Sequence, residues 1–330
     1  MNVAVDADGK GEADQPVAAG WDTYWHGAGG GAAFSRGGTS HPLVLSFWDE
    51  FFGKVREDYA RPRIADIASG SGAVVDCARS ALQGIPAEFT CVDVSESAID
   101  ALVKRFPDVR GVVADARNIP LDSESYDMVT SQFGIEYAGL DAVDEIARLP
   151  APGGRLALLL HHRHGGIYRQ CAASLDAIRM MQAEEFVPRV IETFEAGFEA
   201  YGGGSKSAYQ AAATRLSPAL RAVESIMRKH GRDVADGTVV RLYKDVAAVH
   251  GRLPNYEPSE VLSWLRGLQK ELEAYAERMA SMCDAAIDAD SFARLRDGLK
   301  HKGFVIDRGD ALQNASTGVP LGWALIATRG

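Results

Sequence analysis

The stretch RIADIASGSG, residues 63–72, decides the fold of this chain. Its first half is a short apolar strand that carries the acid Asp66 near its end, and its second half is a turn of small residues directly before a helical segment. Glycine lets a backbone approach a ligand closely, and the first turn of a helix presents unpaired N–H groups. The stretch is therefore typical of a nucleotide-binding loop between a strand and a helix.

The loop differs from a dinucleotide-binding loop in two respects. Val75 stands three residues after Gly72, where the G-x-G-x-x-G pattern requires glycine. Asp66 directly precedes the loop and would repel a pyrophosphate. A ligand without phosphate fits better, because an ammonium or sulfonium group suits the acid and a carboxylate can use the loop amides. A nicotinamide-dependent reductase on the same sheet topology is accordingly disfavoured.

From Arg63 onward, short apolar strands alternate with helical stretches, which is the signature of an α/β sheet with crossover helices. The expected strands are Ile64–Ile67, Glu88–Val92, Val109–Val113, Met128–Ser131, Arg155–Leu160, Phe304–Ile306 and Leu321–Thr328. A polar turn at Asn314–Gly318 favours an antiparallel arrangement of the last two. We therefore predict an α/β fold, a Rossmann-like doubly wound seven-stranded sheet with a C-terminal antiparallel hairpin and a large helical insertion.

Changes in composition and periodicity divide the chain into five parts. Residues 1–20 lack periodicity and are predicted to be a disordered tail. Residues 21–58 form an N-terminal cap or lid. Residues 59–164 and 286–330 build the Rossmann-like sheet. Residues 165–285 form a helical insertion of four helical stretches, expected to act as a substrate lid or a dimerisation element.

Two amphipathic helices are expected from the spacing of their apolar residues. One begins near Thr39-Ser40 and carries an apolar stripe as far as Val55. The other closes the insertion and carries a heptad seam. The seam residues are Val261, Leu265, Leu268, Leu272, Tyr275, Met279 and Met282. Packing within the chain and a homodimer interface both remain open for this seam.

Acids end three consecutive strands of the predicted sheet. Asp93 comes 21 residues after Gly72, the interval at which an acid at the second strand end accepts both ribose hydroxyls. Asp115 follows the third strand, where it is well placed to accept from an adenine amino group. Each acid alone is commonly a turn or cap residue. Open parallel sheets bind ligands outside the carboxyl ends of their strands, so the three acids together predict a ligand site there.

Four motifs resemble the class I S-adenosylmethionine-dependent methyltransferases, in particular the small-molecule group with an aromatic N-terminal cap. They are DIASGSG (66–72), VDVS (92–95), ADA (114–116), and YDMV (126–129) leading to SQF (131–133). The resemblance covers about residues 60–160 and 290–330. It implies an enzyme that transfers a methyl group from S-adenosyl-L-methionine to an oxygen, nitrogen or carbon of a small molecule by in-line displacement, with S-adenosyl-L-homocysteine as product. The alternative is a non-methylating protein that binds S-adenosylmethionine in a regulatory or assembly role.

The same resemblance implies roles at the cofactor. The cofactor-binding residues would be Trp25, Arg36, Asp66, Ala68, Gly70, Asp93, Val94, Asp115, Ala116 and Gln132. Asp66 would orient the methionine amino end, Asp93 the ribose and Asp115 the adenine. Ala68 stands where the pattern often has glycine, a change that costs little if its φ is negative. Arg36 would pair the cofactor carboxylate while the aromatic cap residues approach the sulfonium, or those aromatics simply anchor the tail.

A general base helps when the nucleophile is a hydroxyl or a protonated amine, and the ends of the fourth and fifth strands are the place to expect it. The catalytic candidates are Glu136, Tyr137 and His162. The run His161-His162-Arg163-His164 also suggests a metal site. Strand alternation, however, sends His161 and His162 to opposite faces, and no clear carboxylate partner follows. No metal is therefore expected.

Composition limits the partners. The chain has 330 residues, of which 46% are apolar and 24% charged, as in an ordinary globular protein. Its formal charge of −10 argues against a general binder of nucleic acid or of an anionic membrane. No apolar run approaches the roughly 20 residues that span a bilayer, and the first residues lack the features of a signal peptide. We therefore expect a cytoplasmic protein with a small-molecule substrate.

Overall fold

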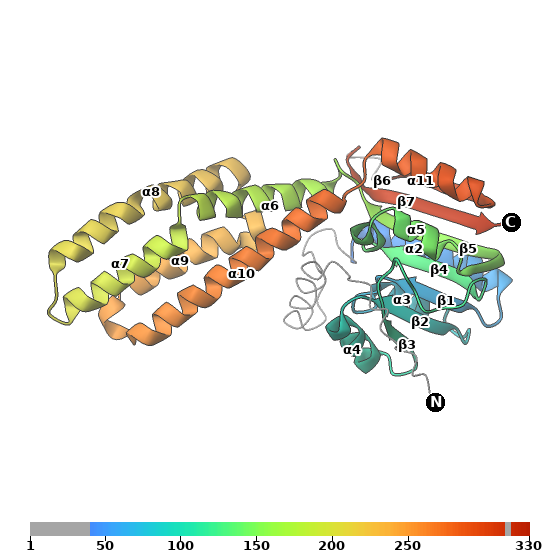
Figure 1. Cartoon of the computed structure of the whole chain (residues 1–330), viewed down its shortest axis with the longest axis horizontal. Helices are drawn as coiled ribbons and strands as arrows, with labels where there is room; N and C mark the ends of the chain where they lie inside the picture. The colour runs from blue at the N-terminus through green and yellow to red at the C-terminus, as the bar shows by residue number, and fades with distance from the viewer. Residues whose placement is uncertain (1–39, 314–317) are drawn as a thin grey trace, which may run out of the picture. The chain divides into compact units, whose positions relative to one another are not determined.

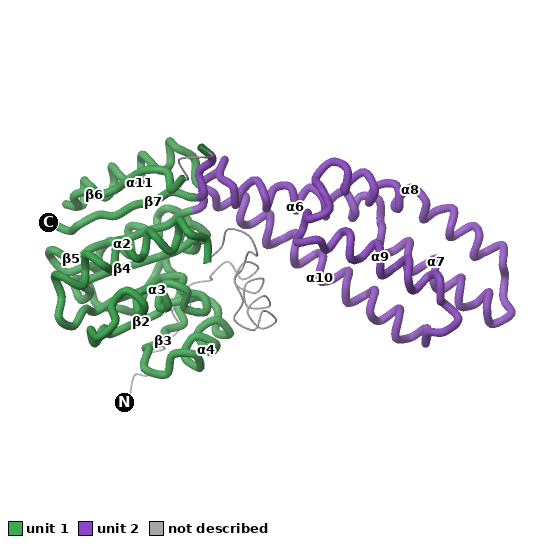
Figure 2. The backbone as a smooth tube through the Cα atoms, turned by 180° about the vertical axis from the view of Figure 1, so that it is seen from behind, with its two compact units in different colours: residues 1–160, 287–318, 322–330 green, residues 161–286, 319–321 purple. Residues whose placement is uncertain are grey.

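The computed structural model describes residues 40–313 and 318–330, which fall into two compact units (Figure 2). Of the described residues, unit 1 contains 40–160, 287–313, 318 and 322–330. Unit 2 contains His161–Ala286 and Val319–Leu321. The expected tail and most of the N-terminal cap lie outside the described residues. The chain thus leaves unit 1 near the end of its fifth strand and returns to it before its last helix.

Unit 1 is built on a seven-stranded sheet (Figure 1). The strands are β1 (Arg63–Ile67), β2 (Glu88–Asp93), β3 (Arg110–Val113), β4 (Tyr126–Gln132), β5 (Pro150–His161), β6 (Phe304–Gln313) and β7 (Pro320–Arg329). They lie in the order β3-β2-β1-β4-β5-β7-β6, and the first five are parallel. The last two form a C-terminal antiparallel pair. The predicted fold class is confirmed.

The sheet of unit 1 is covered by helices, as the nearly continuous apolar sequences of its parallel strands require. The helices are α2 (Pro42–Asp58), α3 (Ala73–Ala81), α4 (Glu96–Arg105), α5 (Asp141–Ile146) and α11 (Ala289–His301). Ala65 and Ile67 of β1 belong to a core cluster with α5 and α11. Because side chains alternate along a strand, Asp66 faces the other way. On that side α2 packs against α3, and α2 reaches the end of β4.

The helix expected near Thr39-Ser40 is α2, which begins at Pro42. His41 is the N-cap residue, and its Nδ1 accepts a hydrogen bond from the Leu43 N–H at 3.1 Å. Pro42 suits the first helical position, because its φ fits a helix and its missing N–H would have no partner there. The apolar stripe is buried as expected, with Trp48 fully buried among three phenylalanines of the same helix.

Unit 2, all of whose residues are described, contains five helices rather than the expected four. They are α6 (Gly166–Ala183), α7 (Phe186–Tyr201), α8 (Lys206–His230), α9 (Thr238–His250) and α10 (Pro258–Ala285), with short turns η2 (Val234–Gly237) and η3 (Leu253–Asn255). The additional break follows Glu184, where Glu185 adopts a left-handed φ of 51°. Pro188 lies in the first turn of α7, the part of a helix that tolerates proline, and is the local signal for this helix start.

The seam of α10 is covered within the chain. Its buried residues are Val261, Leu265, Leu272, Ala276, Met279 and Met282. Leu268 and Tyr275, which were expected in the seam, are half-buried. Since α10 packs against α6 and α7, the seam supplies the core of unit 2 and gives no argument for a homodimer. None of the described helices is both long and apolar enough to serve as a membrane span.

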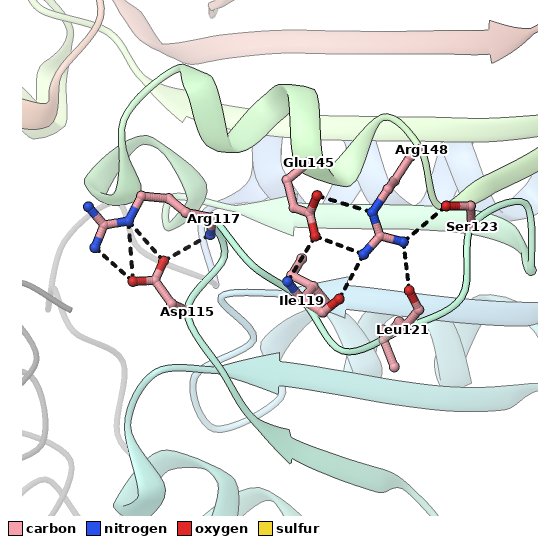
Figure 3. A network of polar contacts seen from close by, with 7 residues as sticks. All are labelled: Asp115, Arg117, Ile119, Leu121, Ser123, Glu145 and Arg148. Carbon is pink, nitrogen blue, oxygen red and sulfur yellow. Dashed lines mark hydrogen bonds and ion pairs between the residues drawn. The ribbon is translucent and has the colours of Figure 1, made fainter. Parts of the chain in front are cut away.

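The described connection from β3 to β4, residues 114–125, contains no helix, and Arg148 holds it in place (Figure 3). Its guanidinium donates to the carbonyls of Ile119 and Leu121 at 2.7 and 2.6 Å. It also pairs with Glu145 at 2.7 Å, and Glu145 accepts the Ile119 N–H at 2.8 Å. Because these two groups bond to each other, the pKa of Glu145 is lowered and that of Arg148 is raised. The network keeps Ile119 and Leu121 in the core.

Replacing Arg148 by methionine should lower the free energy of unfolding by about 2 kcal/mol, because two carbonyls and a carboxylate lose their donor. Chemical denaturation measures this difference. Arg61→Met is the control, since Arg61 forms an exposed pair with Glu88, and its change should stay below about 1 kcal/mol. Equal losses in the two variants would contradict the role given to Arg148.

Candidate functional site

The predicted site lies at the carboxyl ends of the parallel strands, and its most buried charge is Asp66. Asp66 of β1 pairs in register with Thr130 of β4, and their side chains are 1% and 0% exposed. The Thr130 hydroxyl donates to Asp66 Oδ1 at 2.8 Å. Asp66 Oδ2 is buried and has no hydrogen-bond partner among the described residues. An oxygen that retains its acceptor capacity in such a place suits a cationic ligand group.

The surroundings of Asp66 change its acidity. Burial, the largest cause, raises the pKa of Asp66 to about 7. The hydrogen bond from Thr130 lowers that pKa, and the charge of Asp93 raises it. A carboxyl group with one neutral donor and an acidic neighbour is only partly ionised near neutral pH, so a cation that reached it would stabilise the ionised form.

Asp93, expected at the ribose, also ties the glycine loop to the end of β2. Its Oδ2 accepts the Gly70 N–H at 2.8 Å and its Oδ1 accepts the Ser95 N–H at 3.0 Å. Burial raises the pKa of Asp93, while these N–H groups and that of Val94 lower it. A carboxylate oxygen has room for two hydrogen bonds, so this arrangement still allows hydroxyl donors. The sequence reasoning missed this tie, although an acid followed two residues later by serine is a common local turn.

The backbone of the glycine loop is left-handed at three positions. Gly70 and Gly72 have φ of 51° and 88°, and Ala68 has φ of 54°. The expectation that Ala68 has a negative φ, and therefore costs little, is wrong. The loop turns sharply here, and the segment that follows β4 lies close to it. A Cβ on Gly134 would lie 2.5 Å from the Cβ of Ala68.

Ala68→Gly should raise the free energy of unfolding by about 1 kcal/mol, because glycine adopts a positive φ without the clash of a Cβ. Denaturant unfolding of the two proteins measures the difference. Gly134→Ala is the complementary variant, and the 2.5 Å contact should make it destabilising. A less stable Ala68→Gly protein would show that the alanine methyl group contributes packing that outweighs the strain.

Asp115, expected at the adenine, is engaged by a residue that the sequence reasoning missed. Its Oδ2 accepts from Arg117 Nη2 at 2.7 Å and its Oδ1 accepts the Arg117 N–H at 2.8 Å (Figure 3). The side-chain bond from Arg117 lowers the pKa of Asp115. Ala116 between them is half-buried. A ligand amino group would therefore share this carboxylate with Arg117.

Gln132, expected on the methionine side, is oriented by helix α2. Trp48 Nε1 donates to Gln132 Oε1 at 2.5 Å. This bond fixes the amide with its oxygen toward Trp48, so the NH₂ group is the branch available to an acceptor such as a carboxylate. Val94, at the end of β2, keeps 38% of its surface exposed and offers an apolar contact beside Asp93.

The catalytic candidates fall in different parts of the chain. Glu136 and Tyr137 lie in the short turn η1 (Ile135–Ala138) directly after β4 in unit 1, and Glu136 is 4% exposed. His162 belongs to unit 2, where its Nδ1 accepts the His164 N–H at 3.0 Å. Burial is the main cause that lowers the pKa of His162. Because Nδ1 already accepts this N–H, it is poorly placed to remove a proton from a substrate.

Two expected cofactor residues, Trp25 and Arg36, lie outside the described residues.

Within residues 40–313 and 318–330, no three histidine, cysteine, aspartate or glutamate side chains are grouped as metal ligands would be.

The raised pKa of Asp66 predicts a stability that depends on pH. A carboxyl group whose pKa is about 7 when folded and 3.8 when unfolded makes the folded state lose stability as pH rises through that interval. Asp66→Asn should therefore be more stable than the natural protein at pH 8, by up to about 4 kcal/mol, and close to it at pH 4. Urea denaturation at both pH values measures this.

Asp115→Asn is the control for this experiment, because the pKa of Asp115 is lowered and the sign reverses. It should be less stable than the natural protein at pH 8, with the difference disappearing in acid. If Asp66→Asn gave the same difference at both pH values, its effect would be one of packing and not of charge.

Comparison with known proteins agrees with this geometry. Residues 64–154 match the family model described as a methyltransferase domain. An uncharacterized methyltransferase of Schizosaccharomyces pombe is 32% identical over 144 residues, which cover 42% of this chain and 54% of that protein. The ubiquinone/menaquinone biosynthesis C-methyltransferase UbiE of Campylobacter jejuni is 28% identical over 149 residues, covering 40% of this chain and 63% of that enzyme.

Among solved structures, the YcgJ protein of Bacillus subtilis has 23% identity, a TM-score of 0.30 and coverage of 35% of this chain and 50% of that one. The chain spans less than two thirds of the length of these curated relatives. The match therefore concerns a domain, and it includes β1 to β4 with the glycine loop and the strand-end acids. The similarity of residues 64–154 to a methyltransferase domain supports a class I S-adenosylmethionine-dependent methyltransferase fold in this part of the chain.

Proposed function

We propose that the chain is an enzyme that binds S-adenosyl-L-methionine in unit 1 and methylates an oxygen, nitrogen or carbon atom of a small molecule. One observation carries the proposal. Asp66 is buried beside the glycine loop, and its Oδ2 has no hydrogen-bond partner among the described residues. A buried carboxylate oxygen without a donor costs free energy unless a ligand supplies one, and an ammonium group is the best available donor.

The neighbouring groups fit the remainder of this cofactor. The NH₂ branch of Gln132 suits the carboxylate of the methionine portion. Asp93 has acceptor capacity for ribose hydroxyls, and the exposed side chain of Val94 supplies an apolar surface for a base. Gly70, held by Asp93, allows close approach of the backbone. When bound, S-adenosylmethionine would supply a methyl group on a sulfonium, from which in-line displacement releases a neutral thioether.

The chain's own contribution to the reaction is to align the acceptor, exclude water and remove a proton where the acceptor has one to lose. Glu136 and Tyr137 are the better candidates for this base, because they follow β4 within unit 1. His162 is less suited, because its Nδ1 already accepts a backbone N–H. The methyl acceptor then leaves with one carbon more, and S-adenosylhomocysteine is the second product.

The net charge of the chain supports a small molecule as the methyl acceptor. The formal charge of −10 disfavours RNA or DNA, which require a basic face. The Campylobacter relative is named for C-methylation in quinone biosynthesis. Hydroxylated aromatic compounds therefore belong among the first acceptors to test, beside simple amines and alcohols.

Calorimetric titration of the purified full chain with S-adenosylmethionine, S-adenosylhomocysteine and NADH tests the cofactor assignment. Saturable micromolar binding of the first two alone is expected. A labelled-methyl assay with the acceptors named above then follows. Binding of S-adenosylhomocysteine without any methylated product would favour a non-methylating regulatory or assembly role, and failure of folded, ligand-free protein to bind either compound would refute the proposal.

Asp93→Ala should weaken binding of S-adenosylhomocysteine by about 1–3 kcal/mol, because charge-assisted hydrogen bonds to the ribose and to the Gly70 N–H are lost. Circular dichroism should show an intact fold. Asp108→Ala is the matched control, since Asp108 forms an exposed pair with Arg79 and should leave the affinity unchanged. Unchanged affinity in Asp93→Ala would remove Asp93 from the site.

A further inference from the structure

We infer that Thr130 is a positioning residue for Asp66, and that this pair couples binding of the ligand's ammonium group to the release of a proton. The inference rests on the proposed function, because it takes a ligand with an ammonium group as the partner of Asp66. Thr130 acts on ligand binding indirectly, by orienting the carboxyl group of Asp66.

Thr130 holds the carboxyl group of Asp66 in one orientation. The two residues are neighbours on adjacent parallel strands, and the hydroxyl donates to Oδ1 at 2.8 Å. The Ala65 carbonyl is the other acceptor near this hydroxyl, but it lies at 3.4 Å. A threonine side chain has few accessible rotamers, so the position of its hydroxyl is well defined. With Oδ1 occupied in this way, Oδ2 is the atom left for the ligand.

The groups around Asp66 favour its protonated form when no cation is present. Asp93 and Cys91 on β2 and Cys77 on α3 are the titratable groups that interact with it among the described residues, and none of them carries a positive charge. The Thr130 hydroxyl is the neutral donor to its carboxylate. Burial then makes the ionised form costly, and the pKa of Asp66 rises to about 7.

An ammonium group changes this balance. The protonated Asp66 carboxyl group gives its proton to solvent, and the carboxylate pairs with the ligand's ammonium group, whose own proton count is unchanged. Binding therefore releases a fraction of a proton that equals the protonated fraction of Asp66 in the free protein. With a pKa of about 7, that fraction is about one half at pH 7 and falls to about one tenth at pH 8.

The test is calorimetric titration of the full chain with S-adenosylhomocysteine at pH 6, 7 and 8, in buffers of different ionisation enthalpy. The natural protein should release about half a proton at pH 7, and its affinity should be about tenfold weaker at pH 6 than at pH 8. Asp66→Asn should bind S-adenosylhomocysteine more weakly and should lose the proton release that comes from Asp66. Any release measured with this variant comes from other groups.

Thr130→Val removes the hydroxyl and keeps the shape of the side chain, whereas Thr130→Ser keeps the hydroxyl. The valine variant should release more protons at pH 7 and bind about tenfold more weakly, while the serine variant should resemble the natural protein. A merely structural role would lower affinity without changing the proton count. Thermal unfolding of both variants verifies that they are folded.

The outcomes separate this inference from the proposed function. If the natural protein binds S-adenosylhomocysteine without proton release, or if Thr130→Val matches the natural protein in affinity and proton count, the inference is overturned and the cofactor assignment stands. If the folded natural protein binds neither S-adenosylmethionine nor S-adenosylhomocysteine, both are overturned.

Discussion

The two hydrogen bonds that Asp93 accepts from backbone N–H groups are the constraint on which the site depends. The bond from the Gly70 N–H joins the loop after β1 to the end of β2, and the bond from the Ser95 N–H fixes the Asp93 carboxylate in the turn that follows β2. A loop with left-handed residues at Ala68, Gly70 and Gly72 would otherwise be free to relax. The Gly70 N–H is thereby directed at Asp93, while the carboxyl group of Asp66 is oriented by the Thr130 hydroxyl. The edge of the sheet is thereby organised before any ligand arrives.

This organisation costs stability in the absence of a ligand. Asp66 is buried with one oxygen unpaired, and Ala68 adopts a backbone conformation that disfavours alanine. Strain and unpaired charge of this kind collect at binding sites, since a ligand can relieve what the rest of the fold merely tolerates. Apolar side chains buried in the surrounding core offset this loss of stability. Trp48 and its phenylalanine neighbours cover one face of the sheet near Gln132, and the cluster of α5 and α11 covers the other.

Local patterns were enough to predict the seven strands, the acids at three strand ends and the helical insertion. Each of these features follows from residues close together in the chain. The partners of those acids were not predictable in the same way. Thr130 and Trp48 reach their partners across 64 and 84 residues, distances at which an isolated sequence gives no pairing information. The positive φ of Ala68 has no local signal either, and the nearby Gly134 belongs to a segment far along the chain, after β4. The helix break at Glu185 had a local signal in Pro188, and apolar periodicity concealed it.

The strand order has a consequence for how the protein folds. β7 pairs beside β5, yet the whole helical unit from His161 to Ala286 is made between them. During synthesis, β5 therefore stays an open edge of the parallel sheet, and its Leu156–Leu160 segment, fully buried in the finished protein, has no neighbour on that side. Exposed apolar edges promote association between chains. The entropic cost of bringing β5 and β7 together grows only slowly with the number of residues between them. The long connection therefore mainly slows the pairing of these two strands. Chaperone demand during biosynthesis should concentrate on this interval, when five strands are complete and two have not yet been made.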